Sequence, residues 1–161
     1  MATSQRGFVR PAAQVEFTEV RAGAATRSQV LLGPADGMPH FAMRRFVMGA
    51  GGGMPRHTNT VEHEQFVLRG RARISIGDER IEVGPEDVVF IPAGEVHDYT
   101  VLEAPFEFLC MVPNLPDTIE LESSAEVAEY LDTACGGDAE LRARVEALLQ
   151  SHGGAATHRL C

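Results

Sequence analysis

Turn-forming residues interrupt residues 54–113 about every ten positions, and this spacing constrains the fold more than any other feature of the chain. The turns are marked by Gly70, Gly77-Asp78, Gly84-Pro85 and Pro92-Ala93-Gly94. Apolar and β-branched residues dominate the stretches between them, and in residues 71–76 they alternate with polar ones. Short strands joined by closely spaced turns are typical of a sandwich or a barrel. We therefore predict an all-β domain.

The alternation predicts strands over residues 64–68, 71–76, 80–83, 88–91, 97–102 and 105–112, with shorter strands upstream over 14–20, 27–32 and 40–48. We expect the glycine-rich run 49–53 to end the last upstream strand, because such a run does not favour a regular element. Downstream, helical spacing predicts helices over 124–131 and 139–150, with N-caps at Ser123 or Ser124 and at Asp138. The predicted organisation is N-terminal lead-in strands 1–50, a core barrel 51–116, helices 117–152 packed on the barrel and a disordered tail 153–161.

Length and charge exclude several classes of protein. A chain of 161 residues fits one domain with a real core. Its net charge of −9 argues against nucleic-acid binding and against attraction to an anionic membrane surface. No apolar run approaches the ~20 residues that span a bilayer, and residues 1–14 lack the apolar segment of a signal peptide, so we expect a cytoplasmic protein. The three cysteines are odd in number and widely spaced, which argues against a disulfide framework.

Three of the six histidines fall inside the strand-rich region: His57, His63 and His97. Neutral imidazole is the commonest protein ligand of transition metals. Three such ligands leave coordination positions open for water or substrate, as a catalytic site requires. The pattern therefore predicts a metal site, whereas His40, His152 and His158 have no partner pattern and are interpreted as incidental.

These segments resemble the two sequence motifs of the cupin superfamily, and in particular of small single-domain cupins in which histidine replaces the usual glutamate. The first motif is matched by Gly51, His57-Thr58-Asn59, His63 and Gly70, and the second by Pro92, Gly94 and His97. The resemblance implies a cupin jelly-roll barrel with a short C-terminal helical appendage. It also implies a mononuclear divalent metal at His57, His63 and His97, and a homodimer.

Two positions depart from the family pattern. Asn59 stands where the family has its second histidine, and an amide oxygen is a harder and weaker ligand than imidazole. Two ligand sets therefore stay open: three histidines with water, or three histidines with Asn59 as a fourth ligand. Glu86 replaces the turn glycine of the second motif, and we expect Gly84, two residues earlier, to serve that turn.

Several other residues are candidates for the site. Gln65, Glu62 and Cys110 are candidate catalytic residues, although a satisfied core amide, a surface carboxylate and an inert buried thiol are the respective structural alternatives. One of the arginines near the expected barrel mouth is a candidate for holding an anionic substrate: Arg44, Arg45 or Arg56. Arg69, Arg71 and Arg73 alternate on what we expect to be a solvated outer face.

Three functions are consistent with these residues. The first is a dioxygenase-type oxidoreductase that uses Fe, Mn or Cu on a small organic substrate. The second is a non-redox isomerase, lyase or polyketide-type cyclase, in which Zn, Ni or another divalent metal polarises a carbonyl. The third is a non-catalytic cupin that binds a small ligand. We favour the dioxygenase hypothesis from the sequence, while the fold alone does not select a substrate.

Overall fold

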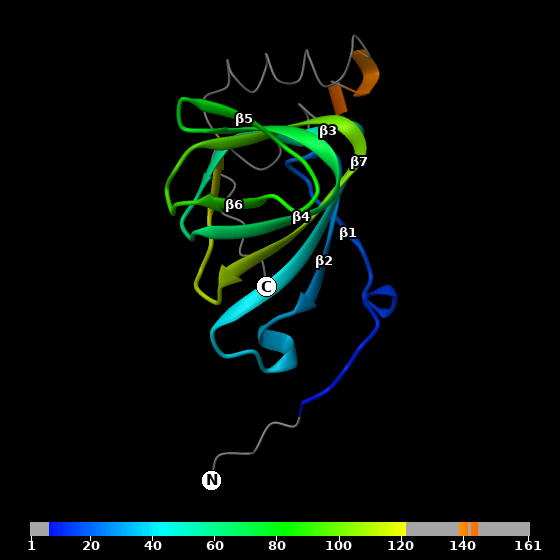
Figure 1. The fold of residues 1–161 in the computed structure, drawn as a ribbon, viewed down its shortest axis with the longest axis vertical. Helices are drawn as coiled ribbons and strands as arrows, with labels where there is room; N and C mark the ends of the chain where they lie inside the picture. Colours follow the sequence, from blue (N-terminus) through cyan, green and yellow to red (C-terminus); the bar gives the residue numbers. More distant parts are fainter. Residues whose placement is uncertain (1–6, 122–138, 142, 145–161) are drawn as a thin grey trace.

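One antiparallel sheet of eight strands curls into a barrel in the computed structural model, which describes residues 7–121, 139–141 and 143–144 (Figure 1). The prediction of an all-β cupin barrel is confirmed. The elements, in chain order, are η1 (Ala12–Gln14), β1 (Thr18–Glu19), β2 (Ala24–Leu32), η2 (Pro34–Asp36), β3 (Phe41–Asn59), β4 (His63–Ile76), β5 (Glu79–Val83), β6 (Val88–Ile91), β7 (His97–Pro113) and β8 (Ile119–Leu121).

Three long strands, β3, β7 and β4, form the centre of the sheet, whose order is β1-β2-β3-β7-β4-β5. Strand β6 pairs with the first part of β4, and β8 pairs with the last part of β3. The long strands curve strongly in Figure 1. This curvature brings the end of β3 to the start of β7, where His57 pairs with His97.

The core lies inside the barrel and follows the two-residue period of the strands. Phe106 and Phe108 on β7 are almost fully buried, as are Ala72 and Ile74 on β4. Tyr99 stacks on Phe108 with 5.6 Å between ring centroids. The barrel interior is therefore apolar, and aromatic rings from β7 are part of it.

The glycine-rich run does not end a strand, and that prediction is wrong. Strand β3 continues from Phe41 to Asn59 through the run, with a register shift against β7 between Met48 and Gly53. Gly51 has φ of 68°, a conformation that glycine adopts without steric cost. The glycines therefore allow the strand to bulge and bend while its pairing resumes beyond them. The strand also crosses the predicted boundary between residues 50 and 51.

Two further predicted strand breaks are absent. Residues 64–68 and 71–76 belong to one strand, β4, and residues 97–102 and 105–112 belong to one strand, β7. Gly70 lies in the middle of β4 with φ of 73°, and a Cβ atom there would clash with the backbone of Glu103 and Pro105. The glycine thus marks a close approach of the two strands at an irregular part of their ladder.

The turn before β6 also differs from the prediction. Glu86 itself adopts the left-handed conformation, with φ of 74°, and its N–H donates to the Val67 carbonyl at 3.0 Å. Gly84 has no positive φ; its N–H donates to the Asp87 carboxylate at 2.7 Å. Gly84 thus opens the turn, because its carbonyl accepts from the Asp87 N–H at 3.1 Å, while Glu86 takes the left-handed position.

Little of the predicted C-terminal appendage falls within the described residues. Residues 139–141 and 143–144 are helical, within the range predicted for the second helix. The predicted helix 124–131, its caps, most of the second helix and the tail 153–161 lie outside the described residues. Within the described part of the chain, no helix is long and apolar enough to cross a membrane.

Candidate metal centre

Three strands bring the predicted histidines together at one end of the barrel. His57 lies near the end of β3, His63 begins β4 and His97 begins β7. The ring centroids of His57 and His97 are 4.2 Å apart, and those of His63 and His97 are 5.5 Å apart. All three side chains are buried. The clustering predicted from the sequence is thus present in the structure.

A β-bulge sets the direction of His57. Met54 pairs with Tyr99 and His57 pairs with His97, so β3 uses one more residue than β7 between the two pairs. Such an extra residue changes which side of the sheet the following side chains face. Met54 and His57 are consequently both buried, although they are three positions apart and would face opposite sides of a regular strand.

Backbone carbonyls orient two of the imidazoles. Nδ1 of His57 lies 2.7 Å from the Pro55 carbonyl, and Nδ1 of His97 lies 2.9 Å from the Glu95 carbonyl. A carbonyl only accepts a hydrogen bond, so in neutral rings the proton resides on Nδ1 and the lone pair on Nε2. Nε2 of His97 and Nε2 of His63 are buried and have no hydrogen-bond partner. This arrangement is the usual way in which a protein presents a histidine to a metal.

Burial also fixes the protonation state of the histidines. Desolvation lowers the pKa of His57 to about 3 and that of His63 to about 2, and it lowers the pKa of His97 as well. The positive charge of Arg44 adds to the effect at His63. The three rings are therefore neutral near pH 7, which is the state that binds a metal.

Asn59 is buried on β3, two residues beyond His57. Its Nδ2 donates to Oδ2 of Asp117 at 2.8 Å, while its Oδ1 is buried without a partner. A carboxylate only accepts hydrogen bonds, so Asp117 determines which end of the amide remains unpaired. Asp117 itself is held by the Thr60 N–H at 3.1 Å from Oδ1. The arrangement makes an oxygen, not an N–H group, available as a fourth ligand.

The residues present fit a divalent transition metal in their chemistry. Neutral imidazole nitrogens and an amide oxygen are suitable ligands for such ions, and burying them unpaired is costly without an occupant. In the described part of the chain, no three His, Cys, Asp or Glu side chains are already arranged to hold a metal ion. The His57 and His63 rings are tilted by 51° and 79° to the His97 ring.

The other predicted site residues have different locations. Gln65 is buried; its Nε2 donates to the Tyr99 hydroxyl at 2.6 Å, and its Oε1 has no partner. Cys110 is buried in the barrel as a free thiol, and burial raises its pKa. A neutral thiol is a poor nucleophile, which favours the interpretation of Cys110 as a packing or contact residue. Glu62 is exposed and lies outside the buried cluster.

Two residues of the site were missed by the sequence analysis. Tyr99 follows His97 by two positions on β7, so strand parity alone was sufficient to identify it as an inward residue. Its ring centroid lies 6.0 Å from that of His97, and burial raises its pKa, so the phenol keeps its proton. No sequence pattern pointed to Asp117, because its contact with Asn59 depends on the path of the chain between β7 and β8.

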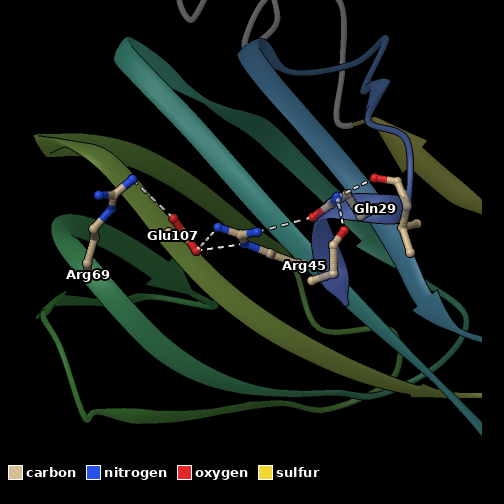
Figure 2. Close-up of polar contacts among 6 residues, drawn as sticks. Gln29, Arg45, Arg69 and Glu107 are labelled. Carbon is tan, nitrogen blue, oxygen red and sulfur yellow. Dashed lines mark hydrogen bonds and ion pairs between the residues drawn. The ribbon is translucent and has the colours of Figure 1, made fainter. Parts of the chain in front are cut away.

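The three arginines near the barrel mouth differ in what they contact. Arg45 faces outward, where its Nε donates to Glu107 at 2.7 Å and its Nη1 to Gln29 at 3.3 Å (Figure 2). Arg56 lies 3.8 Å from Asp98. Arg44 faces inward, with its Nη2 at 3.4 Å from Sγ of Cys110. Among these three, Arg44 is the residue that points into the barrel interior. Arg69, Arg71 and Arg73 lie on the outer face and contact glutamates there, as the alternation predicted.

Comparison with known proteins supports the fold. Residues 44–112 match the family model of the cupin domain. The chain is similar to the polyketide cyclase RemF from Streptomyces resistomycificus, with 26% identity, coverage of 76% of this chain and 91% of that one, and a TM-score of 0.67. It is also similar to a cupin-2 domain from Rhodospirillum rubrum, with 26% identity, coverage of 86% and 96%, and a TM-score of 0.62.

More distant structures share the fold alone. One is a predicted oxalate decarboxylase from Thermotoga maritima, with 18% identity, coverage of 67% of this chain and all of that one, and a TM-score of 0.59. A search of curated proteins finds no match. The matched domain contains all four candidate ligands, and the structural likeness extends over most of the chain. Residues 44–112 are therefore a cupin domain.

Proposed function

We propose that this protein is a metal-dependent enzyme that acts on a small organic molecule inside the barrel. His57, His63 and His97 would hold one divalent transition metal, with Oδ1 of Asn59 as the fourth protein ligand. The observation that carries the proposal is the set of buried, unpaired ligand atoms: Nε2 of His63, Nε2 of His97 and Oδ1 of Asn59. These three atoms lie on the adjacent strands β3, β4 and β7, and their lone pairs suit an occupant that accepts electron pairs.

The chain's own residues have defined roles around this site. The Pro55 and Glu95 carbonyls orient the His57 and His97 rings, and Asp117 holds the Asn59 amide. The apolar interior limits access of water, which strengthens polar interactions with a bound substrate. The Tyr99 hydroxyl keeps its proton and accepts a hydrogen bond from Gln65. When bound, the metal supplies a Lewis acid with open positions for substrate oxygen atoms.

Two reaction classes are supported by different observations. The similarity to a polyketide cyclase at 26% identity favours a non-redox reaction, in which a carbonyl is polarised and a proton is moved. Three neutral imidazoles also suit Fe, Mn or Cu, so the dioxygenase-type reaction favoured from the sequence is retained as the second candidate. We place the cyclase-type reaction first because it has the support of a relative.

Metal analysis of untagged protein tests the proposal. We expect about one equivalent of a transition metal in the wild-type protein. The metal content should fall strongly in His63→Ala and in His97→Ala, because each variant removes one of the proposed ligands. His40→Ala is the matched control, since His40 is exposed and lies outside the cluster. Metal far below one equivalent in the wild type, even after reconstitution, would refute an enzyme of this kind and leave a binding module.

The same samples separate the two reaction classes. Zinc or nickel at full occupancy, with no oxygen consumption in the presence of candidate substrates, would support the non-redox reaction. Iron, manganese or copper with substrate-dependent oxygen uptake would support the dioxygenase instead. Oxygen uptake that persists in the His63→Ala variant would show that neither assignment to this site is right.

A further inference from the structure

Arg44 is a cation inside the barrel, and its placement follows from the strand register. Arg44 pairs with Cys110 across the β3–β7 ladder, and Cys110 pairs with Gln65 across the β7–β4 ladder. Directly opposed residues on neighbouring strands face the same side of a sheet. Because Cys110 and Gln65 are both buried in the barrel, Arg44, Cys110 and Gln65 form one inward-facing row across three strands. We call this row the Arg44 row.

The guanidinium of Arg44 has no anionic partner among the described residues. Its contacts are the Cys110 sulfur at 3.4 Å and the face of the Phe46 ring, with Cζ 5.4 Å from the centroid. A thiol is a weak acceptor, and burial keeps that thiol protonated by raising its pKa. Nε of Arg44 is buried and has no hydrogen-bond partner. A charged donor left in this state is unfavourable unless something binds it.

The neighbouring residue shows what a satisfied arginine looks like in this protein. Arg45 projects to the outer face, where it bonds the buried carboxylate of Glu107 and the Gln29 amide, and Arg69 reaches the same carboxylate (Figure 2). The outer face therefore provides carboxylates for its arginines. On the inner face, Arg44 contacts the Cys110 sulfur and the Phe46 ring, and neither group is a carboxylate.

From these contacts we infer that the Arg44 row is the binding site for an anionic oxygen group of the substrate, a carboxylate or an enolate. Nε and Nη2 lie on one edge of the guanidinium, and this edge binds a carboxylate through two parallel hydrogen bonds. The buried, unpaired Oε1 of Gln65 in the same row accepts a hydrogen bond from a hydroxyl or N–H group of the same ligand. His63 begins β4 two residues before Gln65, so the anion would lie beside the candidate metal centre.

This inference rests on the proposed function for the location of the reacting end of the substrate, but it can be tested without a metal. Acetate and benzoate are the probes, and acetamide and benzamide are their neutral counterparts. Binding is measured by NMR titration at constant ionic strength, in metal-free and metal-loaded protein, with the Nε–H resonance of Arg44 as the direct readout. The resonance is assigned by its loss in Arg44→Lys, which retains the charge but not the two-donor edge.

We expect at least one of the two carboxylates to bind the wild-type protein at millimolar concentration, to shift the Arg44 resonance, and to bind more tightly than its amide. Arg44→Gln should weaken binding at least tenfold in both forms of the protein. Arg73→Gln removes the same charge from an exposed residue on the outer face, and it should leave binding unchanged. If metal-free Arg44→Gln loses carboxylate binding, the loss is then attributable to Arg44 and not to a metal–carboxylate contact.

A stability measurement separates binding from a structural role. Removing a charge that has no anionic partner should leave the melting temperature of ligand-free Arg44→Gln at or above that of the wild type, whereas loss of a structural contact would lower it. The inference is overturned by no carboxylate binding, by equal binding of acid and amide, or by wild-type affinity in Arg44→Gln. Metal-free protein that binds carboxylates through Arg44 but never takes up a metal would refute the proposed function and leave this inference standing.

Discussion

Acid should destabilise the metal-free protein in a way that can be traced to single histidines. Burial lowers the pKa of His57 to about 3 and that of His63 to about 2, from 6.5 in the unfolded chain. Between these values the unfolded state binds more protons than the folded state, so the free energy of unfolding falls as the pH falls. The stabilisation is complete above pH 6.5 and is lost progressively below it.

The magnitude follows from the width of the pH window. One pKa unit corresponds to about 1.4 kcal/mol, so a drop from pH 6.5 to pH 5 costs about 2 kcal/mol for each histidine that stays neutral in the folded protein. His57 and His63 together give about 4 kcal/mol, and the lowered pKa of His97 acts in the same direction. Carboxylates contribute little in this window because their usual pKa values lie below it.

Urea unfolding at several pH values between 5 and 6.5, in protein stripped of metal, measures this dependence. His63→Gln should reduce the loss of stability across the window by about 2 kcal/mol, because the amide has no proton to gain. His40→Gln, at an exposed position, should leave the dependence unchanged. A free energy of unfolding that stays constant from pH 6.5 to pH 5, or a His63→Gln profile parallel to that of the wild type, would refute the reasoning.

Three further predictions concern single residues. Glu107→Gln should lower the free energy of unfolding, measured in urea, by about 2 kcal/mol because Glu107 is buried against Arg45. Arg69→Gln should lower it by less than about 1 kcal/mol because Arg69 is exposed. A larger loss in Arg69→Gln would contradict the conclusion that Arg45 is the main partner of Glu107. Asp117→Ala should weaken metal binding at least about tenfold in a chelator competition by releasing the Asn59 amide, and Asp78→Ala, in an exposed turn, should not. Glu86→Gly should stabilise the protein by up to about 1 kcal/mol by relieving the left-handed backbone at φ of 74°, whereas Glu79→Gly, in strand β5, should destabilise it in the same unfolding assay.

The parts of the fold that could be predicted are those that local sequence patterns specify, such as alternation and turns. Alternation of Ala72, Ile74 and Ile76 with polar residues identified an inward face, and the turn at Gly77-Asp78 identified the hairpin that follows. The spacing of His57, His63 and His97 identified side chains that the structure brings together. Strand length was not predictable in the same way, because a glycine within a strand and a glycine that ends one look alike in sequence. Only the partner strand distinguishes them, as the close approach of Glu103 to Gly70 shows.

The choice between Arg44 and Arg45 shows how a single extra residue decides which charge enters the site. Counting back from His57 in steps of two reaches Arg45, so a regular strand would place Arg45 inside the barrel and Arg44 outside. The bulge between Met54 and His57 adds one residue to β3 and reverses this assignment. The arginine that faces the neutral interior is therefore Arg44, and the arginine that meets the buried carboxylate of Glu107 is Arg45. The same bulge turns His57 toward His97, so it allows the metal ligand and the anion-binding residue to face the same interior. A deletion that restored regular pairing there would be expected to turn His57 away from His97.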